Sequence, residues 1–244
     1  MAIILFMIGI ASNILGTLAG GGGLITLPTM LLLGIPAHSA IGANKVANMV
    51  STSTNIFTMF RKKELTIKEA VPIVIVCAIG GILGGITASY LSTKVLTLTA
   101  IFLLIFAFLL SLFGKASFGE NKQLKLKRKS ASLLAAVGFY DGVFGPGSGT
   151  LLIYIFAAEK LKYMKAVMLG RVGIFATCTG AAIVYIVAGH IMWYETMFLL
   201  VGSVIGAQIG LIFARKISIK TAQILLRCIT VVLIAQLVID FIAM

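Results

Sequence analysis

Charged residues are scarce in this sequence, and acidic residues are the scarcest of all. Among 244 residues there are 20 Lys or Arg and only 7 Asp or Glu, which together make up 11% of the chain. A soluble domain carries roughly 25% charged residues. With 60% hydrophobic residues, the chain lacks the polar side chains that would cover a soluble globule. This composition argues against a cytosolic enzyme and against a disordered scaffold.

Cysteine and histidine are also rare. Cys77, Cys178 and Cys228 lie far apart in apolar stretches, so they indicate neither a disulfide framework nor a metal-ligand spacing, and we expect them to be buried. His38 and His190 fall between apolar segments, where we expect them to face solvent. No cluster of acid, nucleophile and base accompanies them. The sequence therefore predicts no catalytic residues, no cofactor and no metal.

Long apolar runs make up most of the chain. Six of them could cross a hydrocarbon core of ~30 Å as helices, namely residues 39–60, 70–91, 95–113, 166–188, 196–214 and 221–241. Two more, 1–33 and 131–158, are each broken by a glycine cluster. The sequence predicts an all-α integral membrane protein with about eight hydrophobic segments.

The two halves of the chain repeat one another. A shift of 126 residues without gaps aligns Gly16 with Gly142, Gly21 with Gly147, Gly23 with Gly149, Lys45 with Arg171, Gly80 with Gly206 and Gly84 with Gly210. Such a constant offset indicates an internal duplication. We therefore predict two repeats, 1–114 and 131–244, each a broken helical hairpin followed by three spans. A basic linker, 115–130, joins them.

The positive charges predict how the repeats lie in the membrane. Sixteen Lys and Arg fall in four loops, 61–69, 115–130, 160–165 and 215–220, whereas Lys94 is alone in the other loops. These four loops share one face only if each broken segment enters and leaves on the same face, which inverts the second repeat. The positive-inside rule then makes the linker cytoplasmic and places both termini outside. Clusters of this kind are typical of membrane topology rather than of nucleic-acid binding.

The broken segments predict a binding site. The second hairpin has arms of about 14 and 11 residues, which reach only ~17–21 Å, so its tip should stop inside the bilayer. Helices that restart at such tips present N–H groups and positive dipole ends to an anion. The candidate residues are Gly21, Gly22 and Gly23 in the first tip and Gly147, Ser148 and Gly149 in the second. The alternative is that these glycines only permit close helix packing.

Lys45 and Arg171 are the strongest side-chain signal, because each is a cation within an apolar helix at an equivalent repeat position. A lone cation in the membrane requires compensation, and Asp141 is the only acid deep in an apolar segment. An anionic ligand would be attracted by the excess charge, with Asp141 a candidate for proton coupling. A buried pair between Asp141 and either cation is the alternative. Asn44 and Asn48 lie on the same helix face as Lys45, where they could bind the ligand or another helix.

Two motifs resemble a known family. They are Gly16-Thr-Leu-Ala-Gly-Gly-Gly-Gly-Leu-Ile-Thr-Leu-Pro28 followed by Ile41-Gly-Ala-Asn-Lys45, and Gly142-Val-Phe-Gly-Pro-Gly-Ser-Gly149 followed by Gly170-Arg171. The combination resembles the sulfite exporter TauE/SafE family of bacterial and archaeal membrane transporters. The resemblance implies transport of sulfite, an organosulfonate or another small anion across the cytoplasmic membrane, coupled to the proton gradient.

Together these features favour a secondary transporter that alternates access to a site between the hairpin tips. An anion channel and a non-transporting membrane subunit of a larger complex are alternatives. The expected partners are a small anion and the lipid bilayer. A homodimer is compatible with the sequence, which does not determine the oligomeric state.

Overall fold

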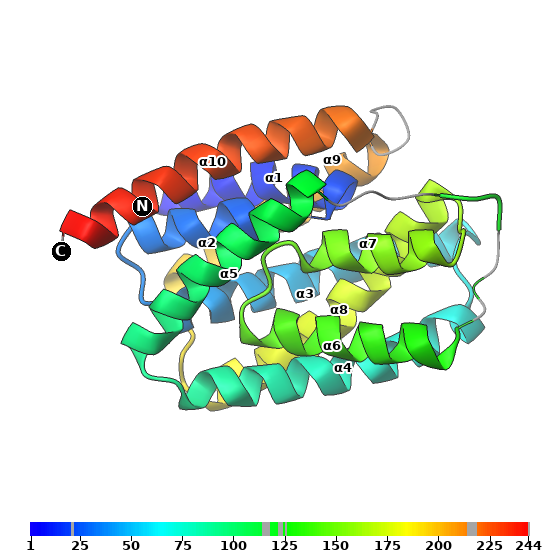
Figure 1. Ribbon diagram of the computed structural model, residues 1–244, viewed down its shortest axis with the longest axis horizontal. Helices are drawn as coiled ribbons and strands as arrows, with labels where there is room; N and C mark the ends of the chain where they lie inside the picture. Colours follow the sequence, from blue (N-terminus) through cyan, green and yellow to red (C-terminus); the bar gives the residue numbers. More distant parts are fainter. Residues whose placement is uncertain (21, 114–117, 122–123, 125, 214–218, 244) are drawn as a thin grey trace.

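The computed structural model describes residues 1–20, 22–113, 118–121, 124, 126–213 and 219–243, and Figure 1 shows their arrangement. These residues form an all-α fold, as predicted, with no named strand in the described part of the chain. The helices are α1 (Ala2–Ala19), α2 (Gly23–Leu32), α3 (Ala37–Arg61), α4 (Ile67–Tyr90), α5 (Thr93–Phe113), α6 (Arg128–Val143), α7 (Ser148–Ala158), α8 (Tyr163–Val187), α9 (Trp193–Phe213) and α10 (Ile219–Ala243).

Each predicted broken segment is a pair of helices, α1–α2 and α6–α7, and the six long helices lie on the six apolar runs. Glycine sets the position of both breaks. Gly20 ends α1 with φ +80°, and Gly145 and Gly147 separate α6 from α7 with φ +102° and +77°. Residues with a Cβ rarely adopt this left-handed conformation. The helix α6 begins at Arg128, inside the segment that we had assigned to the linker.

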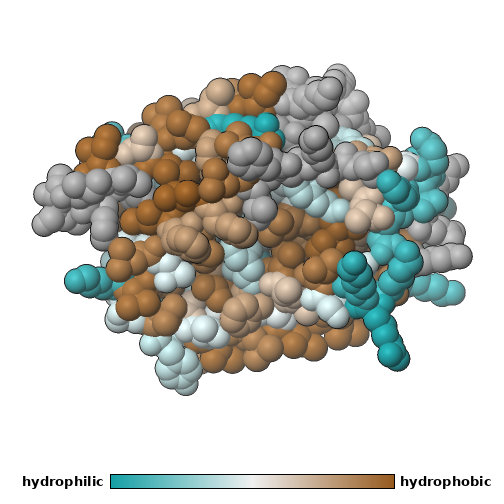
Figure 2. Space-filling model, in the orientation of Figure 1, coloured by the Kyte–Doolittle hydropathy of each residue, from teal (hydrophilic) through white to brown (hydrophobic). Residues whose placement is uncertain are grey.

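The lengths and surfaces of the helices are those of a membrane protein. Four described helices, α1, α4, α8 and α9, are long and apolar enough to span a membrane. In contrast, α2 has 10 residues and α7 has 11, which gives each a length of about 15–17 Å, too short to cross. Hydrophobic residues cover most of the visible face in Figure 2, and most of the strongly hydrophilic ones gather at one end. The chain is a multi-pass membrane protein.

Helix packing is reciprocal between the two halves. The first arm of hairpin one, α1, lies against α9 of the second half, and the first arm of hairpin two, α6, lies against α4 of the first half. Both contacts are close at equivalent glycines. A side chain at Gly206 would collide with the carbonyl of Ile10, and one at Gly80 would collide with the carbonyl of Ala135. The first helix of each half therefore packs against a helix of the other half.

Two of the basic loops, 61–66 and 159–162, lie together at one end of the bundle (Figure 1). Lys165 Nζ lies 2.7 Å from a carboxylate oxygen of Glu69, which ties α8 to the start of α4. Asn121 of the linker donates a 3.1 Å hydrogen bond to the carbonyl of Glu159, after α7. The N-terminus and the α4–α5 turn lie at the opposite end. Loops 61–66 and 159–162 thus share one end, as the charge pattern predicts.

Candidate functional site

The two hairpin tips touch each other. Backbone lies against backbone here, because a side chain at either Gly20 or Gly149 would collide with main-chain atoms of the other residue. The Thr150 hydroxyl donates a 2.8 Å hydrogen bond to the carbonyl of Ala19, which joins α7 to the end of α1. The turn between α6 and α7 lies about halfway along the bundle (Figure 1). The starts of α2 and α7 consequently approach the same interior region.

A small cavity of about 40 Å³ lies at this junction. A buried space needs only ~10–15 Å³ by this measure to hold one water, so the cavity matches a small ion rather than a nucleotide or a peptide. Its lining residues come from both halves: Asn13, Gly16, Thr17, Gly20, Gly22, Gly23, Asn44, Asn48, Asp141, Gly145, Ser148, Gly149, Ile153, Val167, Gly170, Arg171, Ile174 and Cys178.

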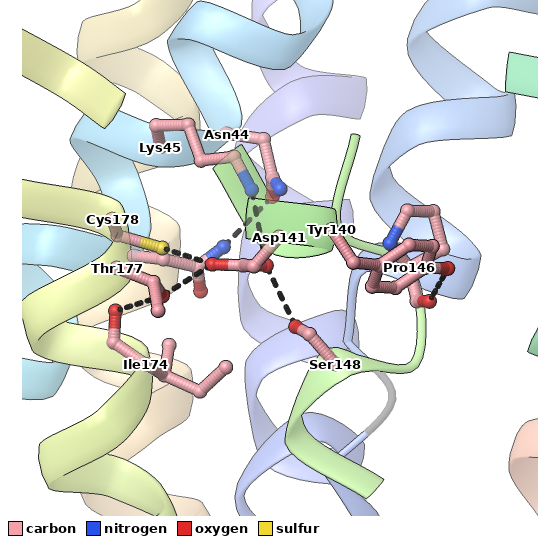
Figure 3. Close-up of polar contacts among 10 residues, drawn as sticks. Asn44, Lys45, Tyr140, Asp141, Pro146, Ser148, Ile174, Thr177 and Cys178 are labelled. Carbon is pink, nitrogen blue, oxygen red and sulfur yellow. Dashed lines mark hydrogen bonds and ion pairs between the residues drawn. The ribbon is translucent and has the colours of Figure 1, made fainter. Parts of the chain in front are cut away.

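Asp141, near the end of α6, is the centre of the hydrogen-bond network in Figure 3. Lys45 Nζ lies 3.1 Å from Asp141 Oδ1, and both side chains are at most 4% exposed. The Ser148 hydroxyl donates a 2.7 Å hydrogen bond to the same oxygen. The Thr177 hydroxyl donates to Oδ2, and the Cys178 thiol lies 3.6 Å from it. Every one of these contacts suits an ionised carboxylate.

The pairing with Asp141 changes the role expected for Lys45. Lys45 Nζ is occupied by the carboxylate, and Lys45 does not line the cavity. This is the buried pair that the sequence left open as an alternative. Because the two charges cancel, Lys45 supplies no net positive charge to a ligand in this conformation. Lys45 is therefore connected to the cavity only indirectly, because it contacts Asp141, which lines it.

Arg171 is in the opposite situation. Arg171 is only 6% exposed, yet its Nη2 atom has no hydrogen-bond partner among the described residues. The guanidinium borders the cavity, and Gly16 lies close to Nη2 because a Cβ there would be 3.9 Å away. A buried guanidinium nitrogen without a partner carries a large desolvation cost. An anion in the cavity would satisfy both its charge and its geometry.

Amide side chains complete the wall formed by α1 and α3. Asn48 Nδ2 donates a 2.9 Å hydrogen bond to Asn44 Oδ1, as expected for residues four apart on one helix face. Asn13 of α1 is buried and accepts a 3.3 Å hydrogen bond from the Ser51 hydroxyl. Sequence analysis missed Asn13, although an amide within the apolar run 1–33 was a usable signal.

The structure brings most of the predicted residues together. The cavity is bordered by eight of them: Gly22, Gly23, Asn44, Asn48, Asp141, Ser148, Gly149 and Arg171. Gly147 does not border it and instead approaches Ala107 of α5, where a Cβ would be 3.1 Å from the alanine Cβ. Gly21 lies outside the described residues. Apart from Asn13, the cavity-lining polar residues that sequence analysis missed are Thr17 and Cys178.

Two expectations about rare residues are wrong. His38 does not face solvent: it lies in the first turn of α3, 8% exposed, with Nε2 3.2 Å from the carbonyl oxygen of Ala88. Its ring stacks on His190, with centroids 4.5 Å apart. Burial and the neighbouring His38 lower the pKa of His190. Cys228 is exposed, whereas Cys77 and Cys178 are buried as expected.

Comparison with known proteins agrees with the resemblance seen in the motifs. The chain is 30% identical to a "probable membrane transporter protein" of Sinorhizobium over 240 residues, which cover 97% of this chain and 92% of that one. It is 28% identical to a protein of the same description in Haemophilus influenzae, over 85% of this chain and 82% of the relative. A Bacillus subtilis relative is 26% identical over 90% of this chain and 93% of its own.

No solved structure matches the chain. The profile of the family described as sulfite exporter TauE/SafE matches residues 5–237, which is nearly the whole sequence. Because that match spans both hairpins and the cavity between them, the chain belongs to the sulfite exporter TauE/SafE family of membrane transporters.

Proposed function

We propose that this protein is a secondary transporter that carries a small sulfur oxyanion, of the sulfite or organosulfonate type, across the cytoplasmic membrane. The observation that carries the proposal is Arg171, a buried cation at a cavity between two touching hairpin tips, whose Nη2 has no partner among the residues that the structure describes. The proposed activity moves the anion without converting it chemically.

The cavity offers an oxyanion three kinds of donor. Arg171 supplies a planar fork of N–H groups that suits two oxygens of one anion. In the first turns of α2 and α7, the N–H groups of Gly23 and Gly149 have no partner within their own helix and lie at the positive dipole end, whereas the Ser148 N–H already donates to the carbonyl of Gly145 at 3.0 Å. The amides of Asn44 and Asn48 provide further polar contacts. Since Lys45 and Asp141 cancel, the cavity favours one negative charge.

Alternating access would move the two repeats against each other. In this proposal the second repeat is inverted relative to the first, and the basic loops face the cytoplasm with both termini outside. The Lys45–Asp141 pair joins α3 of the first half to α6 of the second. Protonation of Asp141 would release Lys45 and loosen that link. Asp141 is therefore the proposed site of proton coupling.

Flux into proteoliposomes tests the proposal. Radiolabelled sulfite or a sulfonate should enter vesicles that contain the wild type, saturate with concentration and respond to a pH gradient. Removing one charged hydrogen bond costs about 1.5–3 kcal/mol, so Arg171→Gln should lower uptake at least about tenfold. Arg171→Lys keeps the positive charge but loses the planar fork of N–H groups, so its uptake should lie between that of the wild type and that of Arg171→Gln. Exposed Lys94→Gln, at the opposite end from the basic loops, is the matched control.

Cys178 gives an independent measure of binding, because its thiol borders the cavity. In a variant that keeps Cys178 alone, with Cys77→Ala and Cys228→Ala, the transported anion should slow modification by a small thiol reagent. Arg171→Gln in that background should abolish the protection. Unchanged flux and unchanged protection in Arg171→Gln would refute the proposal, and single-channel currents in planar bilayers would identify an anion channel instead.

A further inference from the structure

We propose that the protein binds one anionic phospholipid at its basic end, with an acyl chain in a groove between α3, α4 and α8 and the phosphate beside Lys63 and Lys68. This site is separate from the transport cavity. It rests on two neighbouring hollows, one apolar and one basic, that both include residues of α4 and α8.

The apolar hollow is a groove of about 240 Å³, and every residue that lines it is hydrophobic. Its walls include Ile56 and Phe60 of α3, Val71 and Val74 of α4, and Val172 and Phe175 of α8. A groove with no polar group offers nothing to an ion or to a sugar. It suits a hydrocarbon chain.

The basic hollow, about 510 Å³, lies among mostly charged residues of the α3–α4 loop, the start of α4 and the start of α8. Lys63 and Lys68, both exposed, line it together with Lys165, Glu64 and Glu69. Glu69 is held by Lys165 at 2.7 Å, and the Thr66 hydroxyl donates to it at 2.8 Å. That carboxylate is therefore engaged in the wall of the pocket. The lining carries more positive than negative charge, and Arg61 and Lys62 just before it add to the excess.

The sequence positions of the lining residues place the two hollows next to each other. Phe60 in the groove and Lys63 in the pocket are three residues apart, and Ile67 and Lys68 are neighbours. On α8, Lys165 and Val172 are seven residues apart, which places them two turns apart on one face. A ligand that fills both hollows must have an anionic head joined to an apolar tail. Basic pockets between membrane helices bind anionic lipid head groups in this way.

The groove and the transport cavity lie on different faces of α8. Val172 borders the groove, whereas its neighbour Arg171 borders the cavity. The lipid therefore contacts the helix that carries Arg171 without entering the ion site. The lipid proposal does not depend on the identity of the transported anion.

Native mass spectrometry of the purified protein in neutral detergent tests the site with two probes, phosphatidylglycerol and phosphatidylcholine of the same chain length. The wild type should retain one phosphatidylglycerol in preference to phosphatidylcholine. A lysine near an anionic surface contributes about 1 kcal/mol, so Lys63→Gln with Lys68→Gln should lower that preference about thirtyfold. Lys94→Gln should leave it unchanged.

A groove variant separates the lipid from other occupants. Val74→Trp fills the groove and leaves the lysines in place, so it should lower retention of both lipids. Glycerol 3-phosphate, the head group without chains, should not compete at equal concentration. Equal retention of both lipids by the wild type, competition by glycerol 3-phosphate, or a change of oligomeric state in Val74→Trp with lipid retention intact would each overturn the proposal.

Discussion

The two buried cations near the cavity, Lys45 and Arg171, have different electrostatic roles. Lys45 and Arg171 occupy equivalent positions in the two halves, yet of the two, Lys45 alone has a carboxylate partner in the described part of the chain, because Asp141 has no acidic counterpart in the first half. The equivalent of Asp141 is Leu15. Of the two equivalent cations, Lys45 is therefore held by a carboxylate, whereas Arg171 borders the cavity and can bind a ligand.

The Lys45–Asp141 pair predicts a non-additive effect on stability. Removing one partner of a buried pair leaves an uncompensated charge, which costs about 3–5 kcal/mol, whereas replacing both often costs little. Lys45→Met and Asp141→Asn should each lower the thermal midpoint in detergent strongly. The double variant should lie closer to the wild type than either single variant.

The comparison requires an exposed reference such as Lys94→Met, which should leave the midpoint unchanged. Additive losses in the double variant would contradict a direct interaction between the two side chains.

The residue types of the site were predictable, but their pairing was not. An apolar helix that contains a cation identifies Lys45 and Arg171 from the sequence alone. Which cation Asp141 would contact depends on the rotation of α3, α6 and α8 about their axes, and the alignment of the repeats carries no information about that rotation. Asn13 was missed for the same reason, since its face of α1 was unknown.

At the scale of helices, the two hairpins owe their contact to glycine. A residue with a side chain at the crossing of Gly20 and Gly149 would push the two backbones apart. The same contact brings the starts of α2 and α7 to one cavity. The glycines at the tips therefore permit close packing and also border the candidate site, so the packing and the ligand-binding interpretations of the two clusters are compatible.

Gly149→Ala tests this crossing. The added methyl group would meet backbone, which has no rotamer by which to give way, and overpacking of this kind costs about 1–3 kcal/mol. The thermal midpoint in detergent should fall. Gly170→Ala on α8 is the matched control for stability, because its nearest side-chain atom would be 3.4 Å away. A midpoint unchanged by Gly149→Ala would mean that the tips can separate freely.

The positions of the helices followed from the length of each apolar run, and their breaks followed from glycine. The boundaries were less accurate at α6, where Arg128 to Ser130 continue the helix although their charge suggested a loop. Arg and Lys have good helix propensity, so charge alone marks the membrane boundary rather than the helix end. His38 was misplaced similarly, because α3 begins at Ala37 and packs its first turn against Ala88.

For the whole molecule, the position of the basic loops 61–66 and 159–162 at one end of the bundle predicts a labelling pattern. In a cysteine-free background, Lys62→Cys and Lys162→Cys should react with a membrane-impermeant maleimide only after cells are opened. Lys94→Cys, at the opposite end, should react on intact cells. Labelling of the first two positions from opposite sides would contradict the arrangement in which loops 61–66 and 159–162 share one end.

The first helix of each hairpin packs against the opposite half of the chain, and this packing has a consequence for how such a protein could arise. Because α1 finds its partner in α9 and α6 finds its partner in α4, a half-length chain would leave a glycine-lined helix surface bare. Two copies of such a half, each with its first arm packed on the other copy, would cover both surfaces and rebuild the central cavity. Fusion of the two genes would then have allowed Asp141 to appear on one side only, and the cavity to become asymmetric.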